Sequence, residues 1–436
     1  MSICALRLGL LAILAAAFAA SGAQAQQAGS PAATVIAIPP LTSPDTGTRG
    51  NEMLAIAWQA TQLIDADLRQ TSEVMPLTPD RKDYYSYPEV TAPTFSKWRD
   101  KGAKALITGF VQSRSDGRYT IGCYVYDVEK GRELAREGFV ITPADLRRAA
   151  HKCSGLAYKA ITGAPGMFDT RIAYVAETGA PAARVKRIAI MDSDGFNHKY
   201  LTAGDTTVLT PRLSPKAARL AYVTFQGGTP QVRILDIASG EQRPLLPGDA
   251  MTFAPRYSPD GSKIIFSMML GANSDIYVVG ANGGPVRRLT TSPAIDTDAS
   301  FSPDGSKIVF ESDRSGTQQL YVMNADGSNQ RRISFSTAAY SAPEWSPDGN
   351  MIAFTWRMGD IRRVGVIEPD GTGEKILTNG PGDEMPSWAA SSRELVFQRN
   401  EAGRPAIYRV SLDGSAPRKM TIPQDGSDPN WSGTMD

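Results

Sequence analysis

The 436-residue chain is poor in the residues on which metal sites and many catalytic centres depend. It has two histidines and three cysteines, scattered rather than clustered, which argues against a metal site. No Gly-x-Ser-x-Gly motif occurs, and we do not expect His151 or His198 to belong to a catalytic triad. Glycine-rich phosphate loops are absent as well. We therefore expect no catalytic residues and no cofactor.

Charge of one sign is also lacking, because 46 Lys and Arg balance 45 Asp and Glu to a net charge of +1. Such a balance gives no electrostatic footprint for nucleic acid. Two aspartate pairs, Asp192 with Asp194 and Asp296 with Asp298, resemble fragments of calcium loops but lack the remaining ligands. Turn-forming aspartates are the better interpretation of both pairs.

Long hydrophobic runs are missing beyond the first residues of the chain. Arg7 gives a positive start, Leu8 to Ala20 is apolar, and Ala23-Gln24-Ala25 forms a small-x-small cleavage site. The run is shorter than the roughly 20 apolar residues that span a bilayer, and no later stretch reaches that length. We predict a signal peptide over residues 1–25 and a mature protein that begins near Gln26 in an extracytoplasmic space.

Cleavage would remove Cys4 and leave Cys123 and Cys153. Cys123 falls in a predicted strand and Cys153 in a predicted helix, so an oxidising compartment could join them in a disulfide. Sequence spacing does not show whether the two Cβ atoms face each other, and two buried free thiols are the alternative. The sequence leaves both open.

Residues 26–164 lack a repeat and are typical of a small α/β domain with one sheet. Short β-branched runs predict strands, and apolar residues at helical spacing predict helices. A Gly-Ala-Pro-Gly sequence ends the last helix and marks the domain boundary. Tyr84, Tyr85 and Tyr87 lie in a polar loop, either on the domain surface or facing a partner. We expect strands over 34–38, 74–77, 105–111, 119–128 and 133–141, and helices over 50–71, 95–101 and from Thr142-Pro143 onward.

Residues 165–436 are built from a repeat. Ser-Pro pairs at Ser214, Ser258, Ser302 and Ser346 recur every 44 residues, and the last three continue as Ser-Pro-Asp-Gly. Proline presets φ, aspartate can bond the backbone ahead and glycine accepts a positive φ, so the motif is typical of a tight turn. A period of roughly 40–50 residues made of short strands indicates a β-propeller with one blade per repeat.

Counting the strand that follows the turn gives six blades. Its copies begin at Ile172, Leu220, Ile264, Ile308, Ile352 and Leu395. The first copy has no inner-strand motif before it, and the last such motif, Asp428 to Ser432, has no strand after it. We therefore predict a six-bladed β-propeller with four-stranded blades, in which the C-terminal strand completes the first blade and closes the ring.

The residues just before each innermost strand vary, although their neighbours repeat closely. Variation on a repeated scaffold is typical of loops that carry function. The varying positions mix carboxylates with Met, Phe and Tyr, a composition that suits protein docking. Ordinary solvated loops are the alternative. The positions are Met251 to Phe253, Asp296 to Asp298, Tyr340 to Ala342, Asp383 to Met385, and Ser427 with Asp428.

The order of these parts resembles one known family. An export signal, an α/β domain, the segment Thr170 to Val175 and repeats of the Ser-Pro-Asp-Gly-Ser-Lys type are similar to the TolB family. These are periplasmic propeller proteins of the Tol-Pal cell-envelope system of Gram-negative bacteria. The resemblance, which covers essentially the whole mature chain, implies a non-enzymatic protein. It would bind the lipoprotein Pal through the propeller mouth and TolA through the N-terminus, support outer-membrane constriction at cell division, and be exploited by some colicins.

The resemblance also implies which residues face Pal, and it shows one departure. The family usually has a longer mature N-terminal segment, whereas here only residues 26–33 precede the first predicted strand. This short segment weakens the expectation of a TolA contact. A secreted propeller enzyme or a small-ligand sensor is the alternative function. By position, the Pal-facing residues are Met251, Thr252, Asp296, Thr297, Asp298, Ser341, Asp383, Glu384 and Met385.

Overall fold

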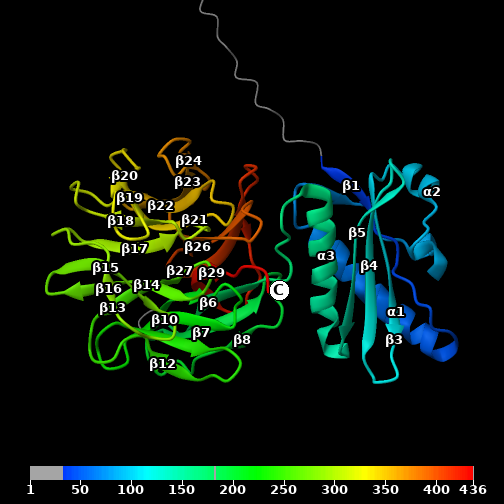
Figure 1. Ribbon diagram of the computed structural model, residues 1–436, viewed down its shortest axis with the longest axis horizontal. Helices are drawn as coiled ribbons and strands as arrows, with labels where there is room; N and C mark the ends of the chain where they lie inside the picture. The colour runs from blue at the N-terminus through cyan, green and yellow to red at the C-terminus, as the bar shows by residue number, and fades with distance from the viewer. Residues whose placement is uncertain (1–32, 181–182, 436) are drawn as a thin grey trace, which may run out of the picture. The chain divides into compact units, whose positions relative to one another are not determined.

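The computed structural model describes residues 33–180 and 183–435 (Figure 1). The predicted signal peptide, residues 1–25, and the start of the mature segment lie outside the described residues. No helix in the described part of the chain is long and apolar enough to cross a membrane. Residues 33–436 group into one compact unit.

The N-terminal part folds around one sheet, as the sequence predicts. The strand order is β2-β1-β3-β4-β5, with β1 parallel to β2 and β3 and the other pairs antiparallel. Short 3₁₀ turns cover Arg81–Asp83, Tyr87–Val90 and Pro143–Asp145. The longer elements are β1 (Thr34–Ala37), α1 (Gly47–Leu68), β2 (Val74–Pro76), α2 (Phe95–Arg99), β3 (Ala105–Ser113), β4 (Tyr119–Asp127), β5 (Arg132–Ile141) and α3 (Leu146–Thr162).

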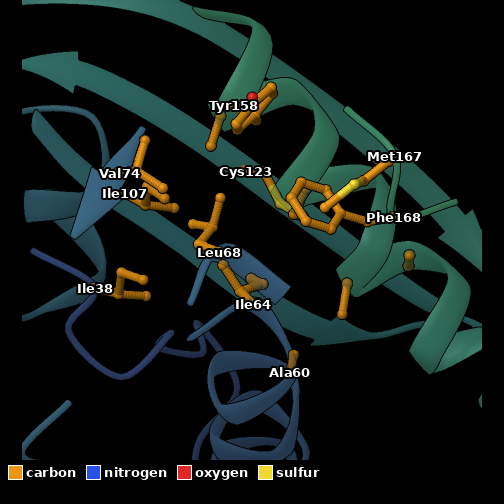
Figure 2. Close-up of a cluster of buried hydrophobic side chains, with 14 of the residues drawn as sticks. Ile38, Ala60, Ile64, Leu68, Val74, Ile107, Cys123, Tyr158, Met167 and Phe168 are labelled. Atoms are coloured by element: carbon orange, nitrogen blue, oxygen red, sulfur yellow. A yellow bond between two sulfur atoms is a disulfide. The ribbon is translucent and has the colours of Figure 1, made fainter. Parts of the chain in front are cut away.

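The core of this domain lies where α1 and α3 meet the sheet (Figure 2). Ile64 and Leu68 of α1 and Ile107 of β3 are fully buried, and each contributes roughly 1.5–3 kcal/mol by leaving water. Met167 and Phe168, from the segment that leads into the propeller, belong to the same cluster. The domain core therefore continues into the connection between the two domains.

A disulfide joins Cys123 of β4 to Cys153 of α3, with their Cα atoms 5.9 Å apart. Both cysteines are buried in the core cluster. The structure thus decides between the two alternatives that the sequence leaves open, because β4 and α3 bring the two side chains together inside the domain.

The tyrosine-rich loop is anchored by its middle tyrosine. Tyr85 is buried, and its hydroxyl donates to the carbonyl oxygen of Gly109 and accepts from the N–H of the same residue, both at 2.9 Å. Tyr87 packs edge-on against Phe110, while Tyr84 is exposed. A partner contact through this loop stays a prediction that rests on Tyr84 and Tyr87 alone.

The repeats fold into six four-stranded sheets, as predicted. In five blades the strands run in sequence order from the inner strand to the outer strand, and in the remaining blade the C-terminal strand β29 is the inner strand. The first three blades are β29 (Asp425–Trp431), β6 (Arg171–Thr178), β7 (Val185–Asp192), β8 (Lys199–Tyr200); β9 (Val208–Leu213), β10 (Arg219–Thr224), β11 (Gln231–Asp236), β12 (Gln242–Pro244); and β13 (Thr252–Tyr257), β14 (Lys263–Leu270), β15 (Asn273–Gly280), β16 (Arg287–Arg288). The others are β17 (Asp296–Phe301), β18 (Lys307–Ser312), β19 (Gln319–Asn324), β20 (Arg331–Arg332); β21 (Ala339–Trp345), β22 (Ile352–Met358), β23 (Ile361–Ile367), β24 (Lys375–Ile376); and β25 (Asp383–Trp388), β26 (Glu394–Glu401), β27 (Arg404–Ser411), β28 (Arg418–Lys419).

The C-terminal strand closes the ring. β29 pairs antiparallel with β6, placing Trp431 opposite Ile172. The six inner strands contact one another in the order β9-β13-β17-β21-β25-β29 and back to β9. Closure of this kind removes the two exposed strand edges that an open array would present, and it confirms the predicted role of the last residues of the chain.

The Ser-Pro-Asp-Gly motif is turn chemistry, also as predicted. The Ser258 hydroxyl donates to Asp260 at 2.5 Å, and Asp260 accepts the N–H of Ser262 at 3.0 Å. Gly261 has φ +70°, which a glycine adopts without strain. Hydrogen bonds from Ser258 and Ser262 lower the pKa of Asp260 to about 2, so this turn keeps its charge at any ordinary pH.

A buried ionic cluster links α1 and α3 to the turn between β7 and β8. On α3, His151 approaches Asp67 through Nδ1 at 2.8 Å and Asp194 through Nε2 at 3.5 Å. Arg147 also pairs with Asp194. Burial opposes a charged imidazole, but the hydrogen bond that the imidazole donates to Asp67 and the charges of Asp67 and Asp194 outweigh it and raise the pKa of His151.

The cluster is expected to weaken as the pH rises. Because the pKa of His151 is higher in the folded state, protonated His151 stabilises the fold. This stabilisation is fully present below the ordinary histidine pKa of about 6.5 and is lost as the pH rises through the folded-state pKa. NMR titration can follow this directly, because His198 is the only other histidine of the chain, and burial lowers its pKa. We expect His151 to titrate above His198, and Asp194→Asn to lower its midpoint. The reverse order of the two midpoints would contradict this assignment.

Candidate functional site

The ring has two ends, which we name by their strands. The mouth is the end where the inner strands begin, and the Ser-Pro end is the one where they run into the Ser-Pro turns or the corresponding segments. Because neighbouring strands are antiparallel, the hairpins β10–β11, β14–β15 and β22–β23 also have their tips at the mouth. All nine predicted partner-binding residues lie at the mouth.

A β-bulge interrupts every inner strand just inside the mouth. The residue in each bulge has a φ between 45° and 57°, and proline follows in every blade except that of β17. Proline lacks an N–H and is tolerated at bulges, which re-aim the side chains of a strand. The bulge N–H groups of Ala342 and Met385 donate to Glu311 and Thr355 of the preceding blade, at 3.1 and 3.0 Å. The bulged residues are Thr210, Ala254, Asp298, Ala342, Met385 and Asp428.

Two of the predicted residues, Asp296 and Asp383, are fully buried in ion pairs. Arg314 donates to both carboxylate oxygens of Asp296 at 2.9 and 2.8 Å, and Arg399 does the same to Asp383 at 2.6 and 2.8 Å. Both arginines also lie over a tyrosine ring. The two ion pairs are internal to their blades, and neither carboxylate is accessible to a partner in this structure.

Thr297 and Asp298 adjoin a buried glutamate, Glu311 of β18. The Thr297 hydroxyl donates to Glu311 at 2.6 Å. Burial, with the charge of Asp298 second, raises the pKa of Glu311 to about 8, and burial also raises the pKa of Asp298. Near neutral pH the two carboxyl groups therefore hold fewer than two negative charges, because a second charge in this position is costly.

Accessibility separates the nine residues. Thr252, Asp296, Thr297 and Asp383 are buried, whereas Met251 is exposed. The remaining residues, Asp298, Ser341, Glu384 and Met385, are partly exposed. Glu384 accepts from Gln398 and pairs with Arg362, so its charge is shared at the rim. The sequence locates the mouth, but only part of its predicted set lines an accessible surface.

The accessible apolar surface at the mouth comes largely from residues outside that set. Leu270, at the β14–β15 tip, is 55% exposed, and Phe335, in the segment that enters β21, is 70% exposed. Exposed apolar side chains that gather at one end of a protein commonly mark a protein-binding site. We call the set the apolar arc because it spans four consecutive blades, from β9–β12 to β21–β24. Its members are Phe225, Met251, Met269, Leu270, Ile295, Phe335, Met358 and Ile361.

A signal for the arc is present in the sequence. Met269-Leu270-Gly271 puts two large apolar side chains just before a glycine at one hairpin tip, and Met358-Gly359-Asp360-Ile361 puts one on either side of a glycine at another. Polar residues are usual at such tips. The sequence-based prediction considers only the residues just before each inner strand, so it misses both hairpin tips. Only Met251 belongs both to the predicted set and to the arc.

Comparison with known proteins gives concordant matches. A family model described as the TolB beta propeller domain matches residues 158–435, and one described as the TolB amino-terminal domain matches residues 27–134. The Tol-Pal system protein TolB of Zymomonas mobilis is 46% identical over 206 residues, 47% of this chain and 45% of that protein. The corresponding protein of Rhizorhabdus wittichii is 49% identical over 191 residues, 44% of each chain. The matched stretch thus spans less than half the length of these curated relatives.

The match to a solved structure covers more of the chain. The crystal structure of TolB from Acinetobacter baumannii aligns with a TM-score of 0.78 and 27% identity, over 92% of this chain and 97% of that one. The alignment therefore includes both the α/β domain and the propeller.

Proposed function

The chain belongs to the TolB family, and from that premise we propose that it is a non-enzymatic, protein-binding scaffold of the Tol-Pal envelope system that holds Pal at the mouth of its propeller. Curated relatives carry the name of that system. The proposal extends to a periplasmic location, to a part in outer-membrane integrity and constriction during division, and to colicins as further ligands.

The apolar arc is the observation that supports this proposal best. Eight exposed large apolar side chains lie at one end of the ring, and the partly exposed Glu384 at the same end adds a charged group. In protein interfaces a few buried apolar anchors commonly supply most of the affinity. A TolA contact through the N-terminal region is the less supported half of the proposal, because its expected segment is short.

The enzyme alternative gains no support from the described residues. The nearest approach to a catalytic arrangement is Ser154, His151 and Asp67. Here the serine hydroxyl donates to Asp67 at 2.7 Å, not to the histidine, so the three side chains do not form the serine–histidine pair of a catalytic triad. The three side chains instead hold α1 against α3.

Charged substitutions in the arc test the proposal. We expect Leu270→Asp with Phe335→Asp to weaken binding of the soluble domain of Pal by at least about tenfold, which is roughly 1.4 kcal/mol, measured by isothermal titration calorimetry. The physical reason is that binding would bury two carboxylates in place of two apolar anchors. Both positions are exposed in the free protein, so circular dichroism and the melting temperature should stay close to those of the wild type.

Val286→Asp is the matched control, because Val286 is an exposed apolar residue just before the outer strand β16, near the Ser-Pro end of its blade. Its affinity for Pal should equal that of the wild type. Equal affinity in the control and in the double variant would remove the arc from the binding site.

A further inference from the structure

The Ser-Pro end of the ring holds a cavity, at the opposite end from the mouth. Its volume is about 290 Å³, and its walls are the Ser-Pro turns and the large side chains at the ends of the inner strands. Those side chains are Leu213, Tyr257, Phe301, Trp345 and Trp431. The walls are thus mainly apolar and aromatic.

At the floor of this cavity lies a ring of six equivalent side chains, one from each inner strand, of which Arg212, Arg256, Ser300, Glu344 and Asn430 line the cavity. Four of them accept the N–H of the next inner strand and so join the blades. The acceptors Ser300, Glu344, Ser387 and Asn430 bind the N–H groups of Trp345, Trp388, Trp431 and Leu213, at distances between 2.7 and 3.4 Å. The other two positions are Arg212 and Arg256, and a guanidinium group has no acceptor atom. They cannot repeat the contact that their four counterparts make.

Both arginines are buried, with 5% and 7% of their surface exposed, and their donors are largely unused. The only hydrogen bond that Arg212 makes to the described residues runs from Nη1 to the carbonyl oxygen of Pro211, at 2.9 Å. It forms no ion pair with them. Arg256 pairs with Glu344 through Nη1, while its Nη2 is buried without a partner in the described part of the chain.

The charges around the pair define what could satisfy it. Burial, with the charge of Arg256 second, lowers the pKa of Arg212 to about 10, so Arg212 is cationic at neutral pH. The charges of Glu344, Asp428 and Asp298 also act on Arg212, and the two aspartates belong to the bulges on the mouth side. These nearby carboxylates disfavour a doubly charged anion. A singly charged one can still use the free donors from the cavity side.

We propose that this cavity binds a small organic monocarboxylate, whose carboxylate contacts Arg212 and Arg256 and whose apolar body packs against Tyr257, Phe301 and Trp345. Guanidinium groups match carboxylates in geometry, and an apolar wall with a few convergent polar groups is typical of small-ligand sites. The site lies at the opposite end of the ring from the proposed Pal surface and does not depend on it.

Benzoate and its neutral isostere benzamide are suitable probes, with binding measured on the full mature protein by ligand-observed NMR and calorimetry. Benzoate should bind, and benzamide at least about tenfold more weakly, because only the carboxylate can use charge-assisted bonds. Arg212→Gln should weaken benzoate binding by a similar factor. Arg287→Gln, at an exposed arginine of β16, should leave it unchanged.

Arg212→Lys provides a second variant that keeps the charge but not the fork of donors, and it should retain intermediate affinity. If Arg212→Gln fails to fold, the comparison of benzoate with benzamide on the wild type still decides the question. No detectable benzoate binding, equal binding of both probes, or unchanged binding in a folded Arg212→Gln would each overturn the proposal. Leu270→Asp with Phe335→Asp should not alter benzoate binding, so the two proposals fail independently.

Discussion

Removing residues 424–436 is expected to abolish cooperative folding of the propeller. The deletion takes away β29, which supplies the inner strand of the first blade and pairs with β6. It also removes Trp431, which is 4% exposed and donates from Nε1 to Thr170 at 2.8 Å. Whole domains are stable by only about 5–15 kcal/mol, so losing one strand of a closed ring is comparable with the entire stability. Urea unfolding followed by circular dichroism measures the effect.

Two milder changes calibrate this result. Trp431→Ala keeps the strand but leaves a cavity, and it should cost about 3–5 kcal/mol. Removing residues 434–436 alone should cost far less, about 1–3 kcal/mol, because it spares β29 and loses the packing of Met435 and its backbone hydrogen bonds with Arg148 and Asp169. A chain lacking residues 424–436 that still unfolds in one transition at the wild-type midpoint would show that the ring does not need closure.

Replacing both cysteines, Cys123→Ser with Cys153→Ser, should destabilise the α/β domain by about 3–4 kcal/mol. The disulfide closes a loop with a sequence separation of 30, which limits the freedom of the unfolded chain. It also ties α3, the carrier of His151, to the sheet. The measurement is the urea midpoint of the α/β domain, with and without reductant.

Full reduction of the wild type, verified by thiol titration, should reproduce most of this loss. The double variant itself should not respond to reductant, which makes it the matched control. A wild-type midpoint that stays the same after complete reduction would mean that the bond does not contribute to stability.

Local chemistry explains why the blades are predictable from sequence. The hydrogen bonds of Ser258 and Asp260 and the positive φ of Gly261 all fall within one short turn. The motif can therefore form the same turn wherever it occurs in the chain. Ring closure is also predictable, since one blade lacks an inner strand and the last segment lacks a partner. The α/β elements follow from the spacing of apolar residues, although the last helix starts at Leu146, after a 3₁₀ turn, rather than directly at Thr142. The Thr142 hydroxyl donates to Asp145 and caps no backbone N–H.

The mouth is less predictable because its properties depend on contacts between strands. Asp296 looks like an accessible carboxylate in sequence, yet Arg314 folds back from the β18–β19 hairpin and buries it. Exposure of Leu270 and Phe335 likewise depends on how far each loop reaches beyond the ring, which spacing alone does not encode. The free donors of Arg212 are visible only against the four acceptors that occupy equivalent places in other blades.

Hydrogen exchange of the mature protein, with and without the soluble domain of Pal, tests whether Pal binds at the mouth. We expect slower exchange in the mouth loops, residues 268–273, 313–318, 335–338 and 358–361, when Pal is added. The turns at Ser258, Ser302 and Ser346 serve as internal controls at the other end of the same blades, and their exchange should not change. Protection at these turns, or none at the mouth loops under saturating Pal, would contradict the account.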